Sequence, residues 1–426
     1  MLIKNNYPLT LEYGNQMKIA MDKLCRVFSC ALDIIEEEQI GASERHSMRV
    51  SALCAAMGKR MGYDNDTLLA LAICALFHDN ALTEYNLSER DGALLEQNMI
   101  LHCEKGQSNV SWLPFKKNID GIILYHHERG NGEGPFHKRE GEYPFEAALL
   151  AAADSIDVTY HLQRISGKNL TALRDKIAAH ADTYSTRSAV DVLLEILDND
   201  MLERLKDENI LKTLDYSLPR WEVDISEQSV FGIASFIAHV IDFKSPFTRK
   251  HISQIANRAW LMGGYYGYSR QERAALYLAA SLHDIGKIAT PVQVLEKPGK
   301  LNYEESQIMQ KHSRNTYDWL GEIPDFGLIQ NWAASHHEKL NGSGYPFGKS
   351  GDTLDFNARL IACLDIYQAV SELRPYHDAR THMQTMPLLY SMADEGLIDG
   401  KIVKDIDKVM GAYSMRDVPS PIDSNE

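Results

Sequence analysis

Residues 276–291 read LYLAASLHDIGKIATP, and this stretch decides the fold. It opens with an apolar run of good helix formers that stops at His283 and Asp284. We therefore expect a buried helix that delivers an imidazole and a carboxylate at its C-terminal end. A single His-Asp pair is weak evidence for a functional site, because a lone histidine on an apolar helix is more often a packed, hydrogen-bonded residue.

The same form recurs earlier in the chain, where residues 69–84 read LALAICALFHDNALTE and the apolar run stops at His78 and Asp79. Around both pairs, further histidines and a final aspartate follow in the same order and at nearly the same intervals. The first set is His46, His78, Asp79, His102, His126, His127 and Asp154. The second set is His251, His283, Asp284, His312, His336, His337 and Asp365. Duplication of one domain explains so long a repeat.

Helical periodicity dominates the rest of the chain, and strand-like alternation is scarce. We therefore predict an all-α protein with two domains, at residues 15–210 and 222–412. The join is expected near Pro219, which interrupts the helical pattern.

The composition limits the classes of partner. The 426 residues carry a formal net charge of −15, which argues against binding to nucleic-acid polymers but is compatible with a small phosphate ligand at a metal site. The six cysteines, none in C-x-x-C spacing, favour a reduced protein; they are Cys25, Cys30, Cys54, Cys74, Cys103 and Cys363. No secretory signal or run long enough to cross a membrane is evident, so we expect a cytoplasmic protein without a membrane partner.

Each set of seven side chains points to metal binding. Polar groups gathered behind apolar helices are costly to bury without partners, and cations supply those partners. Histidine and aspartate ligands suit iron, manganese or zinc, and seven ligands suit two divalent ions bridged by a carboxylate such as Asp284. Two metals about 3.5–4 Å apart can activate a water molecule and neutralise phosphate charge during displacement at phosphorus.

The second half contains the motifs HDIGK at 283–287, HHE at 336–338 and NGSGYP at 341–346. In these motifs it resembles the HD-GYP subgroup of the HD phosphohydrolase superfamily, and the resemblance covers most of residues 230–385. It implies two tandem HD-type helical domains, iron or manganese ions held by the second set, and hydrolysis of a 3′,5′-cyclic dinucleotide to a linear one.

The resemblance also implies roles for individual residues. Asp284 and Lys287 are the expected catalytic residues, with Lys287 holding the scissile phosphate or assisting the leaving oxygen. The expected substrate-binding residues are Gly344, Tyr345, Pro346 and Arg374. Family members with three metals carry a glutamate four residues before the first histidine. Here Phe247 stands at that position, so we expect two metal ions.

The first half keeps its ligand set but loses the surrounding residues. Leu82 stands where Lys287 stands in the second half, Gln163 replaces the arginine after the last aspartate, and the loop at 131–136 lacks a tyrosine. We interpret this half as a regulatory domain with a vestigial site, which one or two metal ions could still occupy. It is expected to contact the second domain.

A tandem pair with an altered first copy resembles the Vibrio HD-GYP proteins that degrade 3′,3′-cyclic GMP-AMP. Nothing in the residues distinguishes guanine from adenine, so a cyclic di-GMP phosphodiesterase stays an alternative. A nucleotidase-like HD enzyme is disfavoured by the Gly344-Tyr345-Pro346 loop, and a non-catalytic cyclic-nucleotide effector would leave Lys287 without a role. The sequence is compatible with a homodimer.

Overall fold

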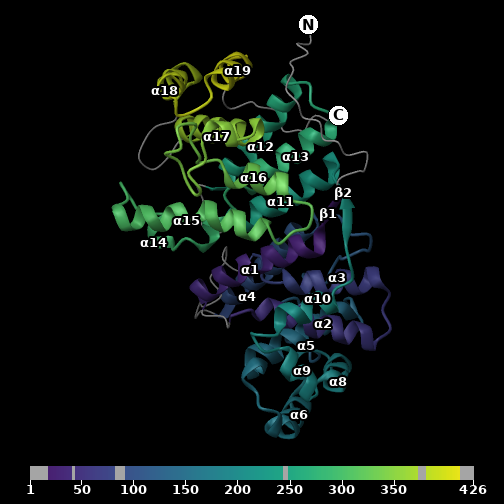
Figure 1. Ribbon diagram of the computed structural model, residues 1–426. Coiled ribbons are helices and arrows are strands. Elements are labelled where there is room, and N and C mark those ends of the chain that lie inside the picture. Colours follow the sequence, from purple (N-terminus) through teal and green to yellow (C-terminus); the bar gives the residue numbers. More distant parts are fainter. Residues whose placement is uncertain (1–17, 41–43, 82–91, 243–247, 373–379, 413–426) are drawn as a thin grey trace. The chain divides into compact units, whose positions relative to one another are not determined.

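The computed structural model describes residues 18–40, 44–81, 92–242, 248–372 and 380–412 (Figure 1). By their contacts these residues form two compact units. The N-terminal unit is Met21–Trp221. The C-terminal unit comprises the described residues of Glu222–Glu426 and the short segment that precedes Met21.

The regular elements that the structure describes in the N-terminal unit are all helices. The α-helices are α1 (Met21–Ile40), α2 (His46–Arg60), α3 (Asn65–Leu76), α4 (Gly92–Val110), α5 (Phe145–Tyr160), α6 (Leu170–Ala179), α7 (Ala181–Tyr184), α8 (Arg187–Ile196), α9 (Asn199–Arg204) and α10 (Ile210–Ser217). Two 3₁₀ helices follow α5, at Leu162–Arg164 and Gly167–Asn169.

The C-terminal unit is also helical, apart from one short strand pair. Its α-helices are α11 (Glu227–Asp242), α12 (Thr248–Tyr265), α13 (Arg270–Leu282), α14 (Val292–Leu295), α15 (Tyr303–Leu320), α16 (Gly327–Ala334), α17 (Phe356–Ser371), α18 (His382–Asp394) and α19 (Gly400–Met410). Its 3₁₀ helices are η4 (Ile285–Ala289) and η5 (Gly351–Thr353). Strands β1 (Lys18–Ala20) and β2 (Glu222–Asp224) pair antiparallel, with Lys18 opposite Asp224.

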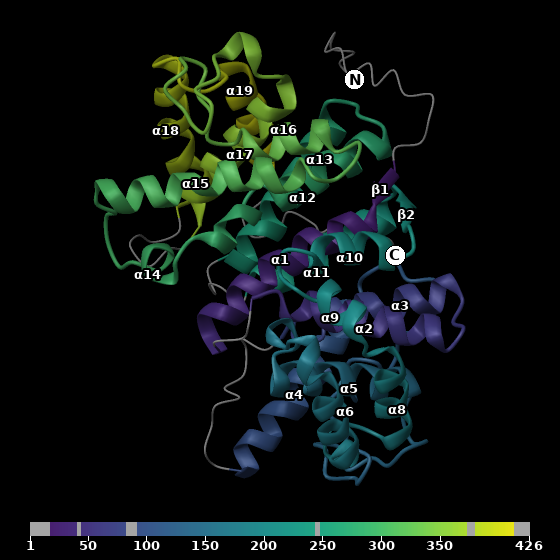
Figure 2. The ribbon, with the colours of Figure 1, turned by 60° about the horizontal axis from the view of Figure 1, so that its bottom comes forward.

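One helix lies at the centre of each unit. Every residue from Leu68 to Leu76 in α3, and from Ala274 to Leu282 in α13, is buried, as expected of helices that are apolar on all sides. In the N-terminal unit α2 packs against α3 and α5, and in the C-terminal unit α12 packs against α13 and α17 (Figures 1 and 2). In both copies of the repeat, the helix that precedes the central helix packs against it and against a later helix of the same unit.

Local signals at the N-terminal ends fix where the central helices begin. Asp64 caps α3 by accepting the Thr67 backbone N–H at 2.8 Å. Ser269 and Glu272 form a capping box at the start of α13. The prediction of an all-α protein is confirmed, and within the described residues the pair β1–β2 is the only sheet.

Candidate metal centres

The central helix α13 ends at Leu282, and His283 and Asp284 follow directly. Nδ1 of His283 lies 2.7 Å from the carbonyl oxygen of Ala280. Because a carbonyl only accepts hydrogen bonds, this contact places the proton of a neutral imidazole on Nδ1 and the lone pair on Nε2. Nε2 lies 3.1 Å from Oδ2 of Asp284. The helix end therefore presents a nitrogen ligand beside a carboxylate.

Two more imidazoles are oriented by the same kind of hydrogen bond to a backbone carbonyl. Nδ1 of His312 donates to the carbonyl oxygen of Met309 at 2.6 Å, and Nδ1 of His336 to that of Ala333 at 2.7 Å. Burial lowers the pKa of His312 to about 3 and the pKa of His336 well below its usual range, so both rings are neutral at pH 7. Their Nε2 atoms lie 3.1 Å apart. Two lone pairs that face each other need a proton or a cation between them.

The two oxygens of the Asp284 carboxylate face different histidines. Oδ2 faces His283, whereas Oδ1 lies 3.5 Å from Nε2 of His312 and 3.6 Å from Nε2 of His336. Burial alone would raise the pKa of Asp284, but His283 and Lys287 hold it well below the usual range, so the group is ionised. An ionised carboxylate that faces two groups of imidazoles has the arrangement of a bridging ligand.

Lys287 approaches this carboxylate from the segment after the helix. That segment is the 3₁₀ helix η4, and it brings Nζ of Lys287 to 2.6 Å from Oδ2 of Asp284. Lys287 follows Asp284 by three residues, which is about one turn of a 3₁₀ helix, so the ammonium group lies beside the candidate bridging ligand.

Asp365 and His337 complete the described part of the second set. Asp365 lies on α17, with Oδ1 3.9 Å from Nε2 of His283 and Oδ2 3.9 Å from Nδ1 of His337. The structure thus brings together six of the seven residues expected from the sequence: His283, Asp284, His312, His336, His337 and Asp365. The side chain of His251, and the residues Phe247 and Arg374, lie outside the described part of the chain.

The GYP loop closes over this centre. Glu338 accepts the backbone N–H groups of Phe347 at 2.7 Å and Lys349 at 2.9 Å, which folds the loop back onto its own start. At Gly344 a Cβ atom would lie 2.5 Å from Cα of Glu338, so only glycine permits this approach. The Tyr345 ring lies 4.7 Å from the His337 ring, centroid to centroid, and burial raises the Tyr345 pKa. A neutral phenol therefore covers one side of the imidazole group.

The N-terminal unit repeats the arrangement around Asp79. Nδ1 of His78 donates to the carbonyl of Ala75 at 2.9 Å, and Nδ1 of His126 to that of Ile123 at 2.6 Å. Oδ2 of Asp79 lies 3.1 Å from Nε2 of His78. Oδ1 lies 3.2 Å from Nε2 of His102 and 3.9 Å from Nε2 of His126. The candidate bridge is therefore present in both units.

His46 and Asp154 belong to the same cluster. Nε2 of His46 lies 3.1 Å from Oδ1 of Asp154, and Nδ1 lies 2.8 Å from Oδ2 of Asp157. Asp157 is held in turn by the buried Arg49, whose Nε lies 3.0 Å from Oδ2. Neither Arg49 nor Asp157 was among the residues expected from the sequence. Arg49 lies three residues after His46, and Asp157 lies three residues after Asp154. This spacing was the signal in the sequence that could have indicated them.

The loop of the N-terminal unit is one residue shorter than the GYP loop. Glu128 accepts the backbone N–H of Phe136 at 2.7 Å and that of Lys138 at 2.5 Å, as Glu338 does in the other unit. With the clamp retained, the loop between its ends is one residue shorter, and the missing residue corresponds to Tyr345. The phenol is therefore deleted in this copy, while the backbone fold of the loop persists.

The residues present fit bound cations. Among the described residues, Nε2 of His78, His102, His126 and His127 and Oδ1 of Asp79 are buried without a hydrogen-bond partner. Nitrogen lone pairs and a carboxylate oxygen that lie within 4 Å of one another, shielded from water, are matched by a divalent cation. In each unit the potential ligand atoms form two groups, one of which contains the shared aspartate.

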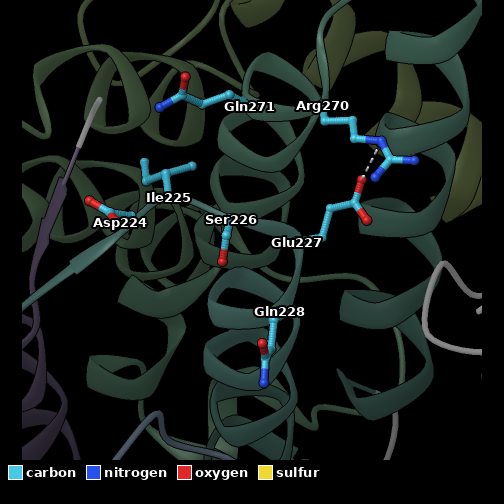
Figure 3. Close-up of a pocket in the computed structure, with 7 residues that line it drawn as sticks. All are labelled: Asp224, Ile225, Ser226, Glu227, Gln228, Arg270 and Gln271. Carbon is cyan, nitrogen blue, oxygen red and sulfur yellow. Dashed lines mark ion pairs between the residues drawn. The ribbon is translucent and has the colours of Figure 1, made fainter. Parts of the chain in front are cut away.

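A surface hollow of the C-terminal unit lies elsewhere (Figure 3). It is formed by the starts of α11 and α13, where Glu227 and Arg270 form an ion pair of 3.5 Å. Its lining contains neither histidine nor cysteine, so it lacks the ligands found in the two clusters. Separately, no described helix combines the length and the apolar character that crossing a bilayer requires.

Fold and geometry together define an all-α protein with a candidate histidine–aspartate metal centre in each of two similar units. A family model for the HD domain matches residues 29–182 and 236–402, and the chain therefore belongs to the HD domain family. The resemblance inferred from the motifs, with two tandem HD-type domains, is confirmed.

Several characterised proteins are similar to this chain. It is 27% identical over 395 residues to the 3′3′-cGAMP-specific phosphodiesterase 1 of Vibrio cholerae serotype O1, an alignment that covers 89% of this chain and 90% of that protein. It is 36% identical over 162 residues to the cyclic di-GMP phosphodiesterase response regulator RpfG of Xanthomonas campestris, covering 37% of this chain and 42% of that protein.

A solved structure shares the fold. The crystal structure of the cyclic GMP-AMP-specific phosphodiesterase V-cGAP3 of V. cholerae matches with a TM-score of 0.64 and covers 94% of this chain and 100% of that chain. The sequence identity is 20%, so this likeness concerns the fold alone.

Proposed function

We propose that this protein is a metal-dependent phosphodiesterase that hydrolyses 3′,3′-cyclic GMP-AMP to a linear dinucleotide in its C-terminal unit. The observation that carries the proposal is the carboxylate of Asp284, which faces His283 through one oxygen and His312 and His336 through the other. The similarity to the V. cholerae enzyme, over 89% of this chain, supports the choice of substrate.

Two divalent ions, manganese or iron, are the proposed cofactors. Their proposed ligands are His251, His283, Asp284, His312, His336, His337 and Asp365. When bound, such ions supply Lewis acidity and an activated water for displacement at phosphorus. The buried carbonyl partners of the histidine Nδ1 atoms hold the rings in place, so little reorganisation accompanies binding.

The remaining residues act directly on the substrate in this proposal. Lys287 donates hydrogen bonds to the phosphate oxygens and neutralises charge that develops on them or on the leaving 3′ oxygen. Gly344, Tyr345 and Pro346 form the wall beside His337, and Glu338 fixes that wall through two backbone N–H groups. Arg374 is proposed to contact the nucleotide.

Cyclic di-GMP is the second candidate substrate. The observation in its favour is the similarity to the Xanthomonas response regulator, which at 36% identity is higher than that to the cyclic GMP-AMP enzyme, although over a shorter segment. The two substrates share the phosphodiester bond and one guanine, so the chemistry at the metal centre is the same for both.

We propose a regulatory role for the N-terminal unit. Its copy has leucine in place of Lys287 and an added Glu133 in the loop. The loop also lacks the counterpart of Tyr345, while Asn131 and Glu133 hydrogen-bond each other at 2.8 Å. A phosphate would meet fewer positive partners and one additional negative charge, which disfavours turnover there.

The test is hydrolysis of cyclic GMP-AMP and cyclic di-GMP, side by side, by manganese-loaded protein with products identified by mass. Faster conversion of the mixed dinucleotide to a linear product is the expected result. Faster conversion of cyclic di-GMP would keep the mechanism and change the substrate. Binding of either nucleotide without turnover, at full metal content, would contradict the proposal and favour an effector.

A further inference from the structure

The residue that follows the third histidine of each ligand set differs between the units. It is Ser313 in the C-terminal unit and Cys103 in the N-terminal unit, and both are fully buried. Oγ of Ser313 lies 3.2 Å from Nε2 of His312. Sγ of Cys103 lies 3.8 Å from Nδ1 of His126. This position therefore reaches the ligand cluster in both units, with a hydroxyl in one and a thiol in the other.

Cys103 belongs to a compact group of four potential ligands. His102, Cys103, His126 and His127 each place one ligand atom within 4.8 Å of the others. The corresponding group in the C-terminal unit contains His312, His336 and His337 without a sulfur atom. The two units thus differ in the chemistry of their donors, since sulfur is a soft ligand and hydroxyl oxygen a hard one.

The imidazoles around the thiol have ring nitrogens without partners. Nδ1 and Nε2 of His102 are both buried without a hydrogen bond among the described residues, as are Nε2 of His126 and Nε2 of His127. In the C-terminal unit, by contrast, Nδ1 of His312 donates to a backbone carbonyl. Nδ1 of His126 donates to Ile123, so a cation in this group would take Nε2 of His126, Nε2 of His127, a nitrogen of His102 and the thiolate. Oδ1 of Asp79 lies 3.2 Å from Nε2 of His102, at the edge of the group.

We propose that His102, Cys103, His126 and His127 bind a thiophilic divalent cation of the zinc class, which makes the N-terminal centre chemically distinct from the C-terminal one. Three imidazoles and one thiolate supply four nitrogen and sulfur ligands, the number and kind that tetrahedral zinc takes. The thiol releases its proton when the cation binds. This cation has a structural role, and the proposal does not depend on phosphodiesterase activity.

Cobalt(II) substitution of the full-length chain tests the proposal without an activity measurement. A cobalt–thiolate bond gives an intense near-ultraviolet charge-transfer band, which nitrogen and oxygen ligands do not produce. We expect this band in the wild-type protein and its loss in Cys103→Ser. The matched control is Cys363→Ser, because Cys363 is a buried thiol of the other unit outside every candidate ligand group, and this variant should keep the band.

The reciprocal variant Ser313→Cys extends the test. It places a thiol beside His312 and should increase the band, since the C-terminal centre then also has a sulfur ligand. Zinc retained after dialysis against a mild chelator should fall in Cys103→Ser by about one equivalent per chain, the content of one four-ligand site. Circular dichroism of each variant verifies that the helical fold is intact.

The wild-type spectrum alone can overturn the proposal, whether or not a variant folds. A cobalt-loaded wild-type protein without a thiolate band would show that Cys103 is a packing residue. A band that survives in Cys103→Ser, or that disappears in Cys363→Ser, would also exclude Cys103 as the ligand.

Discussion

The ammonium group of Lys287 and the carboxylate of Asp284 form an ion pair of 2.6 Å at the edge of the C-terminal centre. An ammonium group has no lone pair, so Lys287 is not a metal ligand and acts as a donor of hydrogen bonds. Its side chain is partly exposed, whereas the carboxylate beside it is buried. The ammonium is therefore placed where a phosphate that reaches the centre from solvent would meet it.

We expect Lys287→Ala to lower kcat for cyclic dinucleotide hydrolysis by about 10²-fold, because loss of one donor to transition-state charge has roughly that effect. Metal content per chain should not change. Steady-state hydrolysis, with metal quantified by mass spectrometry, measures both. Lys297→Ala, which removes a 2.5 Å ion pair with Glu305, is the control and should keep the wild-type rate. Metal loss from Lys287→Ala would show instead that the ammonium holds Asp284 in position.

Two buried arginines, one in each unit, differ in how their charge is satisfied. Arg49 pairs with Asp157 at 3.0 Å. Arg258, at 2% exposure, has no hydrogen bond from Nε or Nη1 to a described residue, and its guanidinium lies 5.3 Å from the centre of the Tyr367 ring. Burial lowers the pKa of Arg258, which reflects the cost of keeping this charge away from water.

This difference predicts opposite effects on stability. Arg258→Leu should raise the free energy of unfolding by about 1 kcal/mol, because a buried charge whose Nε and Nη1 have no acceptor among the described residues is replaced by an apolar side chain. Arg49→Leu should lower it by about 3 kcal/mol, because Asp157 loses its guanidinium partner in the interior and, among the described residues, keeps only the contact with His46. Calorimetry of each variant measures the transition of the unit that carries the substitution. A larger loss from Arg258→Leu than from Arg49→Leu would refute this account of the two charges.

The loop after the paired histidines is built in the same way in both units. A buried glutamate, Glu338 or Glu128, accepts two backbone N–H groups from the far side of the loop. A glycine lies against the Cα atom of that glutamate, at Gly344 and Gly134. The clamp sets the path of the backbone, and the side chains between its ends, Tyr345 among them, determine what covers the ligand cluster.

Gly344→Ala should disturb this loop without unfolding the unit. The new Cβ would lie 2.4 Å from the backbone nitrogen of Lys339, so the backbone must move. We expect kcat/KM to fall by about 10²-fold, since displacements of about 1 Å near a reacting centre have effects of that size. In the control Gly327→Ala, at the start of α16, the added Cβ meets nothing within 4 Å. Wild-type kinetics of Gly344→Ala would show that the loop does not shape the site.

Much of each centre could be predicted from the sequence. An apolar helical run that stops in histidine and aspartate has few structural interpretations, and its repetition with similar intervals predicted the side chains that the fold brings together in each cluster. The partners of those side chains could not be predicted. The pairing of His46 with Asp157 joins residues far apart in the chain, and it depends on how α2 packs against α5.

Two further features could be recognised only in the folded structure. The sequence shows that the first loop lacks a tyrosine, but the bonds from Phe136 and Lys138 to Glu128 establish that the residue is deleted. Cys103 was not among the residues expected in the first ligand set, because a cysteine next to a histidine on a helix carries no spacing signal. Its proximity to His126 depends on how the segment with His126 meets α4.

Duplication gave this chain two similar units, and the residues around the shared carboxylate have since changed differently in the two. Both retain a carboxylate shared between two groups of imidazoles. The C-terminal unit adds an ammonium group to that carboxylate, at Lys287, and a phenol over the cluster, at Tyr345. In the proposed function, metal ligation and phosphate chemistry depend on different residues, so one copy can lose the phosphate chemistry while it keeps the metal ligands.

This separation predicts an asymmetric response to removal of the two His-Asp pairs. His283→Ala combined with Asp284→Ala should abolish hydrolysis, because the shared carboxylate and an imidazole of the proposed catalytic centre are lost. His78→Ala combined with Asp79→Ala should leave measurable turnover, lowered at most by loss of regulation, since that unit has no counterpart of Lys287. Rates, metal content and calorimetric transitions of both double variants should be compared with the wild type. If both proteins are folded and equally inactive, the two centres contribute jointly to catalysis and the division of roles proposed here is wrong.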